Sequence, residues 1–352
     1  MEKNLTTGSV LKSILYFSLP YLLSYFLQTL YGMADLFIIG QFEDISSITA
    51  VSIGSQVMHM ITVMIVGLAM GATVNIGQAI GAGNKKKAAK DIGNTVTLFM
   101  MLAIAGAAGL LFFIKPIVGM MSTPQEAVHE TVIYLTICFL GIPFITAYNI
   151  ISSIFRGIGD SKSPMYFIAA ACAINIILDY LFIGGLHMGA AGAALGTTCS
   201  QTISVLIALV VIMKKKTGIS LSKNDFKIDR KTIKRLLKIG IPVALQDGFI
   251  QIAFIIITII ANRRGLTDAA AVGIVEKVIS FLFLVPSSML STVSALGAQN
   301  VGAGKPERAA ATLKYAICIA GGFGLIIAII IQFTAGNVVN LFTNDQAVVY
   351  AG

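Results

Sequence analysis

Residues 249–261 read FIQIAFIIITIIA, an almost unbroken apolar run that contains no charged residue. A lipid-facing β-strand alternates between lipid-exposed and interior positions with a period of two, and this run does not alternate. The apolar stretch begins at Leu236, so Leu236–Ala261 has the ~20 residues that a helix needs to cross about 30 Å of hydrocarbon. The run therefore predicts a membrane-spanning helix.

The whole chain of 352 residues has the same apolar character. It is 56% hydrophobic and 12% charged, with a mean hydropathy of +0.87, whereas soluble domains carry about 25% charged residues. This composition excludes a soluble enzyme, a disulfide-rich secreted domain and a disordered chain. We predict an all-α membrane protein whose spanning helices are Ile14–Gly40, Ile48–Ile76, Ile92–Val118, Val128–Ser152, Pro164–Gly184, Gly189–Met213, Leu236–Ala261, Ala270–Ala295 and Ala311–Phe342.

Positive charge distinguishes the two ends of these helices. If the N-terminus is cytoplasmic, 21 of the 25 Lys and Arg fall on the cytoplasmic side, ten of them in Lys214–Lys238 and two more, Arg156 and Lys162, in another loop. Cytoplasmic loops carry the excess of basic residues, so we predict a plasma (inner) membrane protein with a cytoplasmic N-terminus. The net charge of +9 then reflects topology and contact with the lipid bilayer, and it does not indicate nucleic acid as a partner.

The sequence contains an internal repeat. Residues 78–83 (QAIGAG) match residues 299–304 (QNVGAG), and residues 50–53 match 271–274, both at an offset of 221. Six predicted helices separate the copies, so both have the same orientation, as in a parallel repeat about an axis along the membrane normal. We predict an N-lobe of six helices at 1–213, a basic cytoplasmic linker at 214–235 and a C-lobe at 236–352. The first copy implies three further helices in the second, so this chain is expected to be a C-terminally truncated form with nine of twelve.

Three motifs resemble the multidrug and toxic compound extrusion (MATE) transporters. They are Ser18-Leu19-Pro20, the Gln-x-x-Gly-Ala-Gly loop in both copies, and residues 155–164, which read FRGIGDSKSP. The resemblance extends along the whole chain and implies a two-lobe bundle with a central cavity that opens alternately to either side. It also implies a secondary antiporter that exports organic, often cationic and amphipathic, compounds in exchange for Na+ or H+. We expect a monomer that acts on small molecules and needs no cofactor besides the coupling ion.

Two carboxylates inside predicted helices are the strongest site candidates, because an ionisable residue in hydrocarbon costs about 2.5–3.5 kcal/mol on insertion scales. Asp35 and Asp179 both lie roughly 8 Å below the outer helix ends, and Asn175 and Thr197 lie roughly 12–14 Å below them. Carboxylate, amide and hydroxyl oxygens suit Na+ or a shared proton. The MATE resemblance implies the same four residues as a cation site, with Na+ at Asp35 and Asp179. The alternative is that they only form interhelical hydrogen bonds.

Other polar residues in the predicted helices are candidates for a substrate cavity: Gln28, Tyr31, Asn149, Asp247 and Gln251. For Asp247 an alternative is a place near the cytoplasmic start of its helix. Pro20 matches the helix-one proline for which the MATE resemblance implies a kink that changes during transport.

Two other functions are compatible with a membrane helix bundle. A lipid-linked glycan flippase of the same superfamily tends to carry cationic cavity residues for pyrophosphate, whereas the predicted N-lobe helices contain Asp but no Lys or Arg. An intramembrane aspartyl protease would use a Gly-x-Gly-Asp motif such as residues 157–160. Asp160, however, is predicted to lie in an inner loop without a second Asp facing it, so we do not expect an enzyme.

Overall fold

The computed structural model of the chain describes residues 5–214, 218–343 and 346–352. These ranges are α-helical and contain no β-strand, and nine segments within them are long and apolar enough to span a membrane. The predicted all-α membrane fold is therefore confirmed. The elements are α1 (Val10–Phe42), α2 (Ile45–Gly81), α3 (Lys85–Phe112), α4 (Ile114–Met120), α5 (Gln125–Ile158), α6 (Lys162–Asp179), the π-helical turn η1 (Tyr180–Gly185), α7 (Gly189–Lys214), the 3-10 turn η2 (Lys223–Phe226), α8 (Arg230–Arg264), α9 (Leu266–Leu282), α10 (Leu284–Gly302), α11 (Pro306–Asn340) and α12 (Gln346–Ala351).

Two predicted helices are interrupted. Ile92–Val118 corresponds to α3 and α4, and Ala270–Ala295 falls on α9 and α10. α3 ends four residues before Pro116 and α9 ends four residues before Pro286. A proline ring clashes with the carbonyl group four residues earlier and supplies no N–H, so these prolines account for both interruptions.

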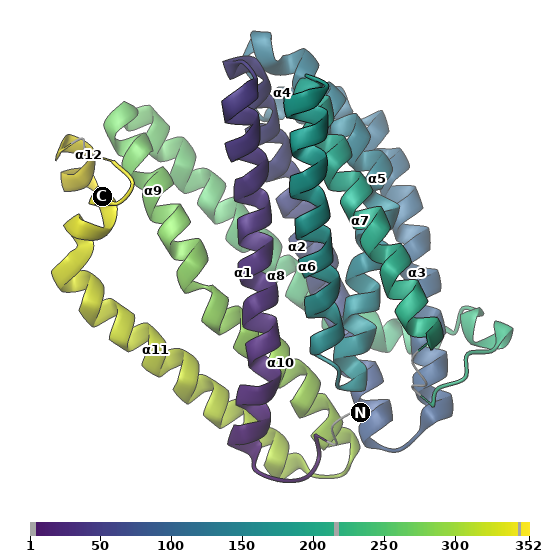
Figure 1. Cartoon of the computed structure of the whole chain (residues 1–352). Helices are drawn as coiled ribbons and strands as arrows, with labels where there is room; N and C mark the ends of the chain where they lie inside the picture. The colour runs from purple at the N-terminus through teal and green to yellow at the C-terminus, as the bar shows by residue number, and fades with distance from the viewer. Residues whose placement is uncertain (1–4, 215–217, 344–345) are drawn as a thin grey trace.

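The first seven helices pack into one bundle (Figure 1). Its largest apolar core joins α1, α2, α5 and α7 through side chains that include Ile39, Val51 and Phe139. In the same bundle Gly54 of α2 lies directly against the ring of Tyr134 in α5. The small residue allows the two helices to approach closely, as is common between membrane helices.

α8 packs on this bundle through close backbone approach. A Cβ atom at Gly71 of α2 would overlap the carbonyl group of Leu236 in α8, and one at Gly240 of α8 would overlap the carbonyl of Leu68 in α2. Glycine on both helices therefore joins the first helix after the linker firmly to the N-terminal bundle.

The repeat found in the sequence forms a reciprocal contact. Gly81 of α2 lies against the backbone carbonyl of Gln299 in α10, and Gly302 of α10 lies against the backbone carbonyl of Gln78 in α2. The two contacts are equivalent in the repeat, because Gly81 and Gln78 in the first copy correspond to Gly302 and Gln299 in the second at the offset of 221. Two copies related by a two-fold axis make such a self-complementary contact. The lobe boundaries at 213 and 236 remain a prediction.

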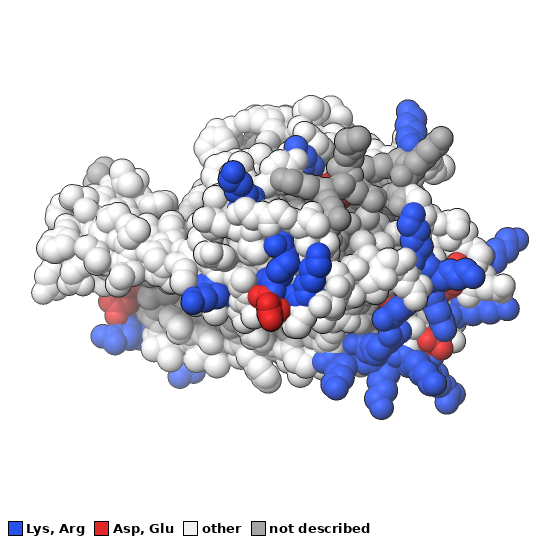
Figure 2. Space-filling view, turned by 90° about the horizontal axis from the view of Figure 1, so that it is seen from below, with Lys and Arg blue, Asp and Glu red and all other residues white. Residues whose placement is uncertain are grey.

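The C-terminal helices meet the N-terminal bundle at the end that carries the N-terminus and diverge towards the other end, where α9 and α12 lie (Figure 1). Figure 2 views the end that carries the N-terminus and shows Lys and Arg spread over it, with few Asp or Glu. Arg308 there donates to the carbonyl oxygens of Gly8 (2.9 Å) and Thr7 (3.3 Å), which ties α11 to the N-terminal segment. The charge asymmetry agrees with the predicted topology, and the cytoplasmic placement of this end remains a prediction.

Candidate cation-binding site

Three helices bring the four predicted cation-binding residues together. Asp35 lies on α1, Asn175 and Asp179 on α6, and Thr197 on α7. Both carboxylates are buried, with 5% of Asp35 and 0% of Asp179 exposed. The depth argument from the sequence therefore selected residues that are neighbours in space.

Hydrogen bonds link these residues in pairs. Thr197 Oγ1 donates to Asp35 Oδ2 over 3.2 Å, and Asn175 Nδ2 donates to Asp179 Oδ1 over 3.3 Å. Asp35 also interacts with the side chains of Asp179 and Asn175, so the two pairs form one cluster. The two carboxyl groups therefore share one small buried volume.

Three oxygen atoms of this cluster are buried and have no hydrogen-bond partner among the residues that the structure describes. They are Asp35 Oδ1, Asn175 Oδ1 and Asp179 Oδ2. A buried acceptor without a partner costs about 1–3 kcal/mol, and more when it is charged. Carboxylate, amide and hydroxyl oxygens are the ligands of hard cations. The cluster therefore has the chemistry to hold a small cation or a proton.

Local backbone features make room for this cluster, and the sequence reading missed them. A Cβ atom at Gly196 of α7 would overlap Oδ1 of Asp179, so only glycine leaves space for that carboxylate. The π-helical turn η1 begins directly after Asp179, and such turns often accompany functional sites. The sequence signal that could have indicated this close approach is Gly196, directly before Thr197.

The predicted substrate residues do not form one group. Tyr31 lies close to Asp35 and Thr197, and Gln28 is exposed on α1. Asn149 is buried and donates to the carbonyl of Ile145 in its own helix over 2.8 Å.

The two candidates on α8 face α2. The carboxylate of Asp247 lies next to Gly67, and Gln251 Nε2 lies 3.4 Å from His59 Nε2. The alternative that places Asp247 at a helix start is wrong, because α8 begins at Arg230 and continues through Pro242. A substrate role for all five candidates remains a prediction.

Asp160 and Arg156 are both predicted to lie in an inner loop, and the structure places only Asp160 outside a helix. Asp160 lies in the turn between α5 and α6, where its Oδ1 accepts from the backbone N–H groups of Lys162 and Ser163, each over 3.1 Å. Its carboxylate thus caps the start of α6. The loop position of Arg156 is wrong, because Arg156 lies in the last turn of α5, is 8% exposed and donates to Ser153 Oγ. The statement that the N-lobe helices contain no Lys or Arg is therefore wrong, and Lys115, within the predicted helix Ile92–Val118, contradicts it as well.

Comparison with known proteins agrees with this arrangement. The MatE family model matches residues 20–181 and 242–352. The probable multidrug resistance protein YoeA of Bacillus subtilis (strain 168) is 27% identical over 349 residues, which cover 97% of this chain and 75% of that protein. The multidrug export protein MepA of Staphylococcus aureus (strain N315) is 28% identical over 341 residues, with coverage of 97% and 75%.

A solved structure described as the outward-facing conformation of a multidrug resistance MATE family transporter is also similar. It superimposes with a TM-score of 0.88 at 26% sequence identity, over 98% of this chain and 77% of that one. The family match begins once at residue 20 and again at residue 242, close to the spacing of the internal repeat. Together with the helical fold, these matches show that the chain belongs to the MATE family of efflux transporters.

Proposed function

We propose that the chain exports organic, cationic amphipathic compounds in exchange for Na+ or H+, and that the coupling cation binds between Asp35 and Asp179. The observation that carries this proposal is the meeting of two buried carboxyl groups from α1 and α6 beside the hydroxyl of Thr197. The named multidrug relatives YoeA and MepA support a multidrug substrate range.

Coupling requires that the cation and the exported compound bind the two transport states with different affinity. A cation that fills the cluster from outside satisfies buried oxygen atoms of α1 and α6 beside the Thr197 hydroxyl of α7, and so favours the state in which these helices are close. Each charge that moves inward gains about 2.3 kcal/mol per 100 mV of membrane potential. Release inside then resets the transporter.

α1 provides the mechanical link in this proposal because it carries both Asp35 and Pro20. Pro20 supplies no backbone N–H inside the helix, and prolines are the usual points at which helices kink. Occupation of Asp35 can therefore bias the bend at Pro20. Gln28 and Tyr31 lie between them on the same helix, in a position to transmit this change to the bound compound.

The test is export from proteoliposomes loaded with ethidium, with an inward Na+ gradient, an inward H+ gradient or no gradient. We expect efflux only with one of the two gradients, and at least about a tenfold loss in Asp35→Asn and in Asp179→Asn. Asp268→Asn is the matched control, because Asp268 pairs with Arg264 over 2.8 Å near the end of α8, away from the cluster. Efflux without any gradient, or equal efflux in all three variants, would contradict the proposal.

A further inference from the structure

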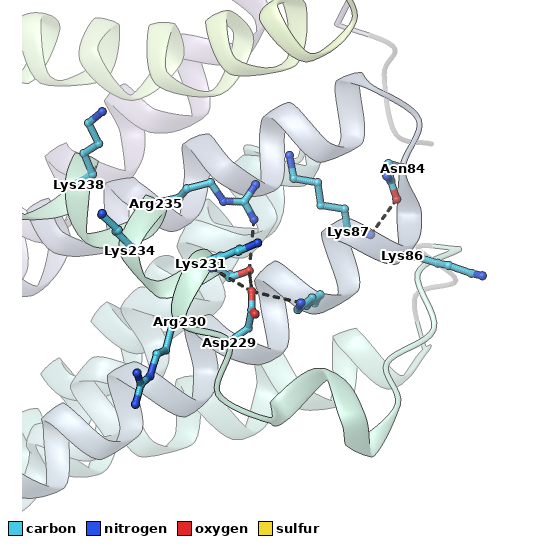
Figure 3. Close-up of a pocket in the computed structure, with 11 residues that line it drawn as sticks. Asn84, Lys86, Lys87, Asp229, Arg230, Lys231, Lys234, Arg235 and Lys238 are labelled. Carbon is cyan, nitrogen blue, oxygen red and sulfur yellow. Dashed lines mark hydrogen bonds and ion pairs between the residues drawn. The ribbon is translucent and has the colours of Figure 1, made fainter.

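A second feature with its own chemistry lies at the basic end of the molecule, outside the cation cluster. It is a cavity of about 1250 Å³ between the N-terminal ends of α3 and α8 (Figure 3). We name it the basic pocket, and its lining residues are Asn84, Lys86, Lys87, Lys90, Asp229, Arg230, Lys231, Thr232, Lys234, Arg235 and Lys238.

Most of the charge in the basic pocket is not neutralised. Eight of its lining residues are Lys or Arg, and Asp229 is the one acidic residue among them. Asp229 pairs with Lys90 over 3.2 Å, and Arg235 pairs with Asp91 over 3.5 Å. The other six basic side chains form no ion pair with another residue in the described ranges.

The basic residues of α8 are arranged on one face of the helix. Lys231 is spaced by three and four residues from Lys234 and Arg235, and these two are spaced by four and three residues from Lys238. Such spacings place like charges next to each other, which is unfavourable on its own. Membrane topology requires only that positive charges lie on this side of the membrane. It does not require that they share a helix face around one cavity, so a bound anion explains the arrangement better.

The basic pocket is also held in shape by polar contacts. Asn94 of α3 donates to the carbonyl of Asp225 over 3.1 Å and accepts from the backbone N–H of Asp229 over 2.7 Å. Thr97 of the same helix donates to the carbonyl of Phe226 over 2.9 Å. Gly93 lies directly against the backbone of Asp225. These contacts fix the segment before α8 to α3, so the pocket exists before a ligand arrives.

Asp229, the single acidic residue that lines the basic pocket, is already engaged in hydrogen bonds and an ion pair. Hydrogen bonds from the Thr232 side chain, from Lys90 and from the Thr232 backbone lower the pKa of Asp229 to about 2. Asp229 therefore stays charged at neutral pH, caps α8 through the N–H of Thr232 and pairs with Lys90. It does not neutralise the face formed by Lys234 and Lys238.

We propose that the basic pocket binds the phosphate group of an anionic ligand. Lysine ammonium groups bind phosphate as point charges and arginine binds it as a planar fork, and the pocket offers both. The phosphate belongs either to the headgroup of an anionic lipid or to a soluble phosphate compound. Lys238 directly precedes the apolar part of α8, so the pocket extends from the solvent to the level where headgroups begin.

The experiment uses the purified chain in nanodiscs of neutral phosphatidylcholine and measures the midpoint of thermal unfolding. One arm replaces part of the lipid with phosphatidylglycerol, and another adds sodium pyrophosphate, with sodium sulfate as the ionic-strength control. The test variant is Lys234→Gln/Lys238→Gln. The matched control is Lys223→Gln/Lys227→Gln, which removes two exposed charges from the same basic segment outside the pocket. Lys234→Arg/Lys238→Arg restores the charge.

We expect the midpoint of the wild type, the matched control and the Arg variant to rise in one of the two arms. The rise should fall by at least about half in Lys234→Gln/Lys238→Gln. A rise with phosphatidylglycerol alone assigns the pocket to lipid headgroups, and a rise with pyrophosphate assigns it to soluble phosphate. Native mass spectrometry of the lipid retained by the folded fraction gives the same comparison if the Gln variant is less stable.

Three results would overturn the proposal. The midpoint does not rise in either arm, the Gln variant of the pocket keeps the full rise, or the matched control loses as much as the pocket variant. The last result would mean that only the diffuse charge of this end matters.

Discussion

The carboxylate of Asp179 occupies the space that a side chain at position 196 would need. At the scale of single residues, the cation site therefore depends on a missing side chain as much as on the four polar ones. Glycine in a helix interior costs roughly 0.5–1 kcal/mol relative to alanine, so its use in α7 is explained by this close approach.

Gly196→Ala should displace the Asp179 carboxylate from the cluster. We expect overpacking to lower the free energy of unfolding by about 1–3 kcal/mol and the affinity for the coupling ion to fall at least about tenfold, measured as the cation-dependent shift in thermal unfolding. Gly106→Ala on α3 is the control, because an added Cβ there has nothing within 4 Å. An unchanged cation-dependent shift in Gly196→Ala would show that Asp179 does not need this position.

Thr197→Val should weaken Na+ binding, because it removes a hydroxyl oxygen that lies 3.2 Å from Asp35 Oδ2 and can coordinate the ion. The loss of one of the few oxygen ligands should raise the Na+ concentration for half-maximal ethidium export about tenfold or more, which corresponds to about 1.4 kcal/mol of binding free energy. Thr197→Ser keeps the hydroxyl and should export like the wild type. The role of the hydroxyl is disproved if the Val and Ser variants behave alike.

At the scale of secondary-structure elements, the sequence predicts where spanning helices exist better than where they are interrupted. All nine spanning helices are found, because each is encoded by a long apolar run. Their ends extend further than predicted since polar residues, as at Arg230 in α8, continue a helix beyond the hydrocarbon. The breaks before Pro116 and Pro286 were not predicted, because the residues around them are apolar. Pro20 and Pro143, by contrast, lie inside unbroken helices. Proline alone thus does not decide whether a helix stops.

Among the residues that join the linker to α3, Asn94 makes two of the hydrogen bonds. Asn94→Ala removes the side chain that bonds to Asp225 and Asp229 in two part-buried hydrogen bonds, each worth about 0.5–1.5 kcal/mol. We expect faster amide hydrogen exchange in residues 222–229. Asn224→Ala, at an exposed position, should leave exchange elsewhere in the linker unchanged. Equal exchange in Asn94→Ala and wild type would mean that α8 alone positions this segment.

At the scale of the whole molecule, the two repeat copies meet through equivalent glycines. Gly81→Ala and Gly302→Ala would each place a Cβ against a backbone carbonyl of the other copy. We expect both variants to lose a similar free energy of unfolding, about 1–3 kcal/mol, measured by chemical denaturation. Gly273→Ala, where an added Cβ has open space, is the control. A large loss in only one of the two variants would contradict equivalent roles for the copies.

The candidate site was predicted as far as spacing and depth allow. Asp35, Asn175, Asp179 and Thr197 were found because polar residues in apolar helices are conspicuous, and their depth could be counted from the helix ends. The burial of Arg156 and the pairing of Gln251 with His59 could not be predicted, since they depend on how one helix rotates against another. Residue periodicity does not encode that rotation.

The central claim is that the carboxyl groups of Asp35 and Asp179 together hold an exchangeable cation. Infrared difference spectroscopy of the purified chain tests it most directly, by recording carboxyl bands when Na+ replaces choline and when the pH is changed. We expect a band change in at least one of these steps that disappears in Asp35→Asn/Asp179→Asn and persists in Asp247→Asn. A difference spectrum that the double variant leaves unaltered would show that these two carboxyl groups do not hold the cation.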